Sequence, residues 1–150
     1  MRLGIDLGSR NIKLVYGKDE SYKKICFETI GFYKKYGRHL NNKFEIDLEK
    51  LYFDVIGEKG FFDKIISTGY GRNSVSLQGS EADEVIFINN ITEIKAHALG
   101  AVKQFNKKDL LVIDIGGQDT KIIQIKNEKI IDFEINDNCA ASSGRYLENM

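Results

Sequence analysis

The sequence predicts an α/β protein built from two related halves, and three observations lead to this fold class. Short apolar or alternating segments end at glycine turns, as strands do. Two longer segments repeat their apolar residues at helical spacing. Finally, the segment GIDLGSRNIKLV near the start is echoed by VIDIGGQDTKII in the second half, each with strand, Asp, apolar residue, Gly, turn, Lys and strand. A repeat of this kind indicates a duplicated architecture.

The composition excludes several classes of protein. The 150 residues carry 22 Lys and Arg against 22 Asp and Glu, so the formal net charge is zero, and we expect no nucleic-acid partner and no anionic membrane partner. Apolar runs such as Leu110 to Ile113 are far too short to span a bilayer, and the start lacks a signal-peptide profile. The two cysteines, Cys26 and Cys139, form no disulfide framework. We therefore expect a protein of the reducing cytoplasm.

The first half is expected to hold a strand meander, a helix and further strands. The segment 32–45 is rich in Lys, Tyr and Asn with little periodicity, and we interpret it as a surface excursion. Asp47 is placed near the N-cap of the expected helix, which continues with Leu48, Leu51 and Val55 at helical spacing. The strands are expected at 3–7, 11–16, 24–30, 64–67 and 84–88, and the helix at 47–56.

A helix that links the two lobes is expected at 92–105, with its apolar residues on one face. The polar stretch 105–109 follows, and we take it as the lobe boundary. The predicted domains are therefore a first lobe at 1–107 and the start of a second lobe at 108–150. Three more strands are expected at 110–115, 121–125 and 130–135, with a helix beginning at 140.

The first glycine turn has the composition of a phosphate loop. Asp6 ends a buried strand, Gly8 and Ser9 form the turn, and Lys13 follows in the next strand. Glycine lets backbone N–H groups approach a phosphate, and the Ser hydroxyl and Lys ammonium add donors. Asp6 is suited to hold Mg²⁺ through water. A plain β-hairpin is the commoner explanation of this motif when it is taken alone.

The second copy favours the functional interpretation. Asp114 again ends an apolar strand, and Gly116, Gly117 and Gln118 form the turn. Two such hairpins facing each other would clamp a polyphosphate between two lobes. Because no GxxxxGK[ST] and no GxGxxG motif is present, a P-loop or Rossmann domain is disfavoured.

Three further side chains come into question. Glu93 starts the linking helix, where it either interacts with the helix dipole or orients water and binds Mg²⁺ indirectly. His97 follows one turn later and is interpreted as structural. Cys139 is either a buried inert thiol or a ligand of a soft metal centre near a helix start. We assign Cys26 to strand packing.

The motifs GIDLGS, STGYGRN, ITEIKAHALGA, DIGGQDTK and NDNCAASSGR occur in this order along nearly the whole chain. Together they resemble the activators of 2-hydroxyacyl-CoA dehydratases within the BadF/BadG/BcrA/BcrD ATPase family. The resemblance implies an actin-like ATPase fold of two RNase H-like lobes with ATP and Mg²⁺ between them. It also implies a homodimer that shares one [4Fe-4S] cluster, with two cysteines from each subunit. ATP hydrolysis in such proteins drives transfer of a low-potential electron to the dehydratase component.

The resemblance implies a role for each matching residue. Asp6, Gly8, Ser9 and Lys13 match the first phosphate loop, and Asp114, Gly116, Gly117 and Gln118 match the second. Glu93 matches the connecting acidic residue, and Cys139 matches the first cluster cysteine. The chain departs from the family pattern at Ser142 and Ser143, which replace a glycine and a threonine.

The second cluster cysteine and the adenosine-binding glycine motif of the family have no counterpart in these 150 residues. The chain therefore resembles the N-terminal part of an activator, and we expect weak or absent ATP hydrolysis, little iron and self-association from this part alone. Two rival hypotheses remain at this stage. One is a sugar or small-molecule kinase of the same fold, and the other is an actin-like interaction lobe without enzymatic activity.

Overall fold

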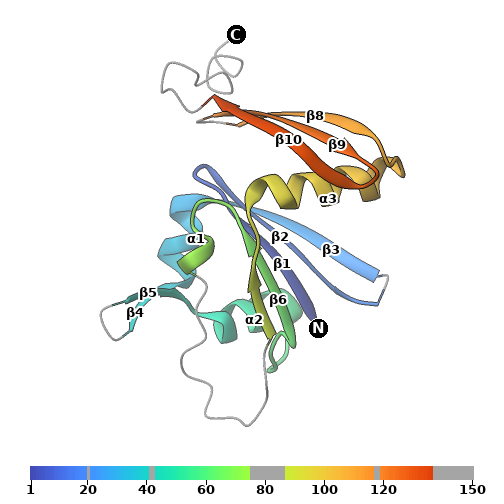
Figure 1. Cartoon of the computed structure of the whole chain (residues 1–150). Helices are drawn as coiled ribbons and strands as arrows, with labels where there is room; N and C mark the ends of the chain where they lie inside the picture. Colours follow the sequence, from blue (N-terminus) through green and yellow to red (C-terminus); the bar gives the residue numbers. More distant parts are fainter. Residues whose placement is uncertain (20, 41–42, 75–86, 117–118, 137–150) are drawn as a thin grey trace. The chain divides into compact units, whose positions relative to one another are not determined.

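A computed structural model describes residues 1–19, 21–40, 43–74, 87–116 and 119–136 (Figure 1). The chain divides by its internal contacts into two compact units, Met1–Ile91 and Thr92–Met150. Each unit has its own sheet and its own apolar core. Among the described residues, no helix is both long and apolar enough to cross a membrane.

The first unit is built on a five-stranded mixed sheet in the order β3-β2-β1-β6-β7. As predicted, the first three strands form an antiparallel meander joined by short turns. The later strands β6 and β7 run parallel to β1, so the carboxyl ends of β1 and β6 lie at the same edge. The bounds are Arg2–Leu7 for β1, Asn11–Lys18 for β2, Ser21–Glu28 for β3, Lys64–Thr68 for β6 and Phe87–Asn90 for β7.

The predicted surface excursion at 32–45 is wrong. A helix, α1 (Thr29–Tyr36), follows β3 directly, and a short hairpin of β4 (Gly37–Leu40) and β5 (Lys43–Ile46) comes next. Glu28 caps α1, because its carboxylate accepts hydrogen bonds from the backbone N–H groups of Ile30 and Gly31. The strand expected at 24–30 therefore ends two residues early.

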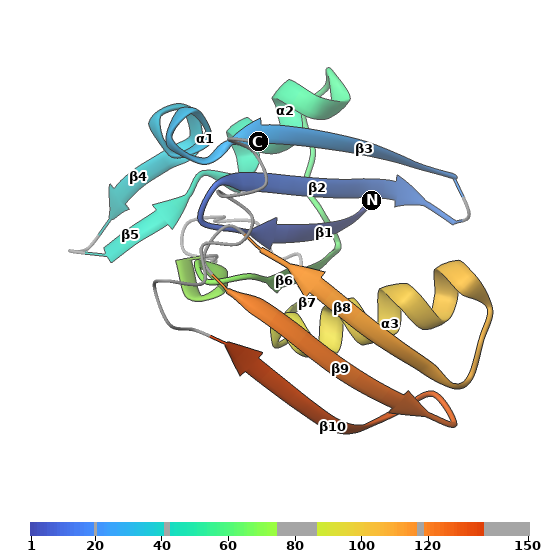
Figure 2. The ribbon, with the colours of Figure 1, turned by 90° about the horizontal axis from the view of Figure 1, so that it is seen from above.

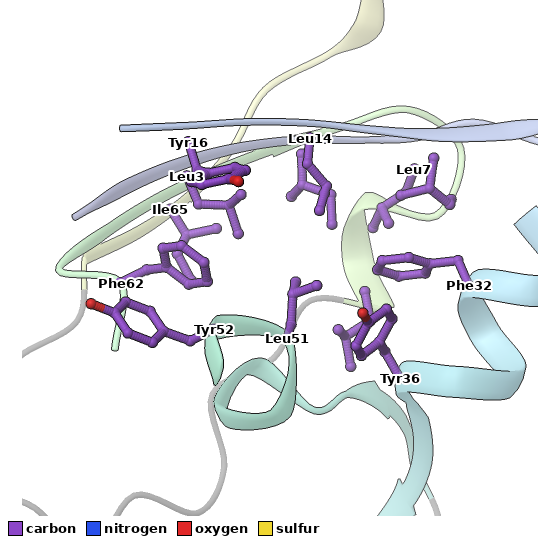
Figure 3. Close-up of a cluster of buried hydrophobic side chains, with 13 residues drawn as sticks. Leu3, Leu7, Leu14, Tyr16, Phe32, Tyr36, Leu51, Tyr52, Phe62 and Ile65 are labelled. Carbon is purple, nitrogen blue, oxygen red and sulfur yellow. The ribbon is translucent and has the colours of Figure 1, made fainter. Parts of the chain in front are cut away.

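The core of the first unit lies between the sheet and its helices. Figure 3 shows the aromatic side chains of α1 directed at the leucines of β1 and β2. The second helix, α2 (Leu48–Ile56), is capped by Asp47 as predicted, and its Leu51 is fully buried. The central members of this core are Leu3, Leu7, Leu14, Phe32, Tyr36, Leu51 and Ile65.

The second unit pairs one helix with a three-stranded antiparallel sheet in the order β10-β9-β8 (Figure 2). Helix α3 (Glu93–Phe105) is capped by Thr92 and packs Ala98 against Ile123 and Ile125. The predicted helix and strands are confirmed, with bounds of Leu110–Ile115 for β8, Thr120–Lys126 for β9 and Lys129–Asn136 for β10. The helix expected from residue 140 lies outside the described residues. By its contacts α3 belongs with this sheet to the second compact unit, which begins at Thr92. The lobe boundary expected at 107/108 stays a prediction.

Truncation of Leu51 tests the core of the first unit. We expect Leu51→Ala to lower the free energy of unfolding by about 3 kcal/mol, because it removes a fully buried side chain and leaves a cavity. Phe53→Ala is the matched control on the same helix, since Phe53 is half exposed, and it should cost about 0.5 kcal/mol or less. Urea denaturation followed by circular dichroism measures both. Equal losses in the two variants would contradict this packing.

Candidate functional site

Two hairpins, one in each unit, place an aspartate directly opposite a lysine. In the β1–β2 hairpin Asp6 pairs with Lys13, and in the β8–β9 hairpin Asp114 pairs with Lys121. The distance from Lys Nζ to Asp Oδ2 is 3.5 Å in the first hairpin and 3.6 Å in the second. The echo seen in the sequence is therefore also a geometric repeat.

The turn of the first hairpin requires glycine and is tied to α1. A Cβ on Gly8 would lie 2.7 Å from the carbonyl oxygen of Asn11, so no side chain fits there. The hydroxyl of Thr29 donates to the carbonyl of Gly8 at 3.0 Å, and the Thr29 N–H donates to the carbonyl of Arg10 at 3.0 Å. Ser9 is exposed between these anchors. Sequence reasoning missed Thr29, since it placed this residue inside a strand.

The carboxylate of Asp6 is only partly engaged. Its Oδ2 faces Lys13, whose side chain is 63% exposed. Its Oδ1 is buried and has no hydrogen-bond partner among the described residues. A buried acceptor of this kind suits a ligand that donates a hydrogen bond or carries positive charge.

The second hairpin differs because its lysine is buried among carboxylates. The side chain of Lys121 is 5% exposed, and its Nζ lies 2.5 Å from Asp119, 3.4 Å from Glu93 and 3.6 Å from Asp114. Burial alone lowers the pKa of Lys121, but the hydrogen bond to Asp119 and the fields of the carboxylates outweigh it and raise the pKa. This ammonium is therefore held within the protein, whereas that of Lys13 is largely open to solvent.

His97 joins the same cluster. Its Nδ1 lies 3.1 Å from Oδ2 of Asp114. This hydrogen bond raises the pKa of His97 and lowers the pKa of Asp114, against the opposing effect of partial burial on each group. Sequence reasoning set His97 aside, although its position one turn after Glu93 places both side chains on the same helix face.

One atom each of Glu93, His97 and Asp114 lies within 4.8 Å of the others, so these residues have the spacing of a cation site. The ammonium of Lys121 contacts two of the three, however. A divalent cation bound directly to these carboxylates would compete with that ammonium. The arrangement therefore favours contact through water.

The remaining predicted site residues divide into described and undescribed positions. Gly116 donates from its N–H to the carbonyl of Asp119 at 2.8 Å, and a Cβ there would lie 2.9 Å from the Asp119 carboxylate. Gly117, Gln118 and Cys139 lie outside the described residues. Cys26 belongs to β3 as expected, but its side chain is exposed, so its assignment to packing is wrong.

The His97–Asp114 pair makes stability depend on pH. The pKa of His97 is raised above its ordinary 6.5, so its contribution is complete below pH 6.5 and is lost as the pH rises through the folded pKa. The pKa of Asp114 is lowered from 3.8, so its contribution is present above pH 3.8 and is lost as the pH falls through the folded pKa. Both contributions are complete between about pH 4 and 6.5.

We expect His97→Gln to cost the second unit about 1 kcal/mol at pH 6 and much less at pH 9. Hydrogen exchange of the β8 and β9 amides at the two pH values measures this. His39→Gln, in the first unit, is the control. In this variant the stability of the second unit should depend on pH as it does in the unmutated chain. An equal loss at both pH values would refute the pairing.

Comparison with known proteins places this geometry in a family. Residues 3–150 match the BadF/BadG/BcrA/BcrD ATPase family. The uncharacterized protein MJ0004 of Methanocaldococcus jannaschii is 40% identical, over 99% of this chain and 53% of its own length. The activator of lactoyl-CoA dehydratase of Anaerotignum propionicum is 35% identical, over 99% of this chain and 51% of its own length. The chain thus spans about half the length of these relatives.

Solved structures agree on the fold. Component A of the (R)-2-hydroxyglutaryl-CoA dehydratase of Acidaminococcus fermentans superposes with a TM-score of 0.68 at 30% identity, over 99% of this chain and 52% of its own. A putative 2-dehydro-3-deoxygalactonokinase of Sinorhizobium meliloti superposes with a TM-score of 0.57 at 12% identity, over 99% and 56%, and shows the fold alone. These likenesses confirm the predicted actin-like ATPase fold. By sequence and by fold, the chain belongs to the BadF/BadG/BcrA/BcrD ATPase family.

Proposed function

We propose that this chain is the N-terminal, phosphate-binding part of an ATP-dependent activator. Such an activator delivers a low-potential electron to a 2-hydroxyacyl-CoA dehydratase or a related CoA-ester reductase. The observation that carries the proposal is the repeated hairpin, in which a carboxylate, a glycine turn and a lysine recur in both units. Sequence similarity to proteins named as activators of 2-hydroxyisocaproyl-CoA dehydratase and of lactoyl-CoA dehydratase supports a dehydratase as the partner. Loss of ATP affinity on removal of the Lys13 ammonium tests the proposal.

The first hairpin fits a nucleotide phosphate with its Mg²⁺. When bound, ATP supplies the phosphoanhydride that is hydrolysed, and Mg²⁺ offsets phosphate charge. Gly8 keeps the turn free of a side chain, while the exposed Ser9 hydroxyl and Lys13 ammonium supply donors. Oδ1 of Asp6, which has no hydrogen-bond partner among the described residues, would accept from a water molecule of the hydrated cation.

The second hairpin would contribute a preset network of carboxylates. Asp114 is oriented by His97 and Lys121, and Glu93 is held by the same lysine. Because these contacts fix the orientation of both carboxylates, Glu93 and Asp114 can orient water at the phosphates. We propose that Gly116, Gly117 and Gln118 of this hairpin take part in phosphate binding.

The proposal includes a [4Fe-4S] cluster in a cytoplasmic homodimer, for which Cys139 is the candidate ligand. Such clusters are held by four thiolates. Two copies of Cys139 would supply two of them, and the family resemblance implies a second cysteine from each subunit for the others. The rival kinase hypothesis draws no support from the comparisons, because the kinase likeness at 12% identity shows the fold alone.

The second unit presents an exposed apolar surface in this chain alone. Alternate residues of β8 and one of β9 form an exposed apolar sheet face, opposite the face that packs on α3; they are Leu111, Ile113, Ile115 and Ile122. Apolar faces of this kind usually mark an interface between proteins. In this chain alone, which spans about half the length of its relatives, the face favours self-association with a second copy.

Removal of the Lys13 ammonium tests phosphate binding. We expect Lys13→Met to weaken binding of Mg·ATP about tenfold, because a charge-assisted hydrogen bond to phosphate is lost. Lys18→Met is the matched control, since Lys18 lies on the same strand at the exposed far end. Isothermal titration calorimetry measures both variants. Equal affinities of the two variants would count against this hairpin as a phosphate site, and unmeasurable binding by the unmutated chain would count against the whole proposal.

A charge placed on the apolar sheet face tests this self-association. We expect the unmutated chain to self-associate and Ile113→Lys to shift it towards monomer, because a lysine in the interface would have to be desolvated. Val15→Lys is the control, since Val15 is an exposed β-branched residue of the first unit. Light scattering over a concentration series gives the masses. A monomeric unmutated chain would exclude this interface.

A further inference from the structure

One motif has no role in the proposed function, namely the STGYGR loop (Ser67–Arg72). It begins at the carboxyl end of β6, which pairs in parallel with β1. In that register Thr68 lies directly beside Asp6. Because side chains of cross-strand neighbours project from the same face of a sheet, Thr68 and Asp6 share the face opposite the core.

Hydrogen bonds hold the STGYGR loop against the end of β1. The N–H of Gly71 donates to the carbonyl of Leu7 at 3.0 Å. The hydroxyl of Ser67 donates to the carbonyl of Arg72 at 3.1 Å, and the guanidinium of Arg72 donates to the carbonyl of Gly69 at 3.2 Å. The loop is thus a closed turn with a fixed position relative to Asp6.

Gly69 brings the backbone of this loop up to the Asp6 carboxylate. Its φ is +84°, in the left-handed region that favours glycine. A Cβ at this position would lie 2.6 Å from Oδ1 of Asp6 and 2.8 Å from the backbone nitrogen of Leu7. Any larger residue would therefore displace the carboxylate.

Two buried oxygens at this point have no hydrogen-bond partner among the described residues, Oδ1 of Asp6 and Oγ1 of Thr68. Buried polar atoms are almost always satisfied. The carboxylate oxygen only accepts, whereas the hydroxyl both donates and accepts. A phosphate oxygen cannot satisfy the carboxylate, because it too is an anionic acceptor. A water molecule can satisfy both oxygens.

We propose that Thr68 is a positioning residue: its hydroxyl and Oδ1 of Asp6 together hold one water molecule. This water belongs to the hydration shell of the cation that accompanies the nucleotide, a part of the inference that rests on the proposed function. Thr68 thereby sets where the cation sits without contacting it.

Two variants separate the hydroxyl from the shape of the side chain. Thr68→Val keeps the volume and removes the hydroxyl, whereas Thr68→Ser keeps the hydroxyl. Crystal structures of the nucleotide-free chains, at a resolution that shows ordered water, provide the first readout. We expect an oxygen within about 2.7–3.2 Å of both atoms in the unmutated chain and in Thr68→Ser, and its loss in Thr68→Val. A direct Thr68–Asp6 hydrogen bond, or an unchanged water in Thr68→Val, would overturn the inference.

The second readout is the Mg²⁺ concentration needed for half-maximal ADP binding. We expect Thr68→Val to raise it about tenfold and Thr68→Ser to change it less than about twofold. An unchanged Mg²⁺ requirement in Thr68→Val would overturn the link to the cation. If the unmutated chain bound no nucleotide, the proposed function would fail, while the crystal structures would still decide whether Thr68 and Asp6 share a water. Melting curves of the three proteins establish that all are folded.

Discussion

The antiparallel register that sets Asp6 opposite Lys13 is the constraint on which the rest of the candidate site depends. It requires a tight turn between the strands, and Gly8 permits that turn because a Cβ would strike the Asn11 carbonyl. A slip of one residue would carry every side chain of β2 to the other face of the sheet. The buried leucines of β1 and β2 exclude such a slip, so the core that stabilises the unit also fixes the site.

The two halves share this hairpin but use their lysines differently. Lys13 remains largely exposed and meets one carboxylate, whereas Lys121 is buried among three. Part of the difference lies within the repeat, where Asp119 stands at the position of Asn11. The rest arises outside it, because Glu93 and His97 come from α3, which packs on the second sheet.

Sequence reasoning succeeded where local signals were strong. Glycine-bounded apolar strands gave both meanders, and Asp47 and Thr92 marked the starts of their helices. It failed at α1, because this helix buries only Phe32 and Tyr36, and the lysines between them mask the spacing. The roles of Thr29 and His97 were not predicted from the sequence for another reason. Their roles are contacts with residues far away in sequence, to Gly8 and to Asp114, which no local pattern encodes.

The charge of the second cluster explains how three carboxylates can belong to the proposed phosphate site. Alone, Glu93, Asp114 and Asp119 would repel an anionic ligand strongly, since they lie close together and are partly desolvated. The ammonium of Lys121 offsets one of these charges, and His97, whose pKa is raised by its hydrogen bond to Asp114, offsets a second when it is protonated. A carboxylate whose charge is offset in this way keeps its geometry and its capacity to accept hydrogen bonds from water. The cluster is therefore suited to orient water beside an anion rather than to exclude the anion.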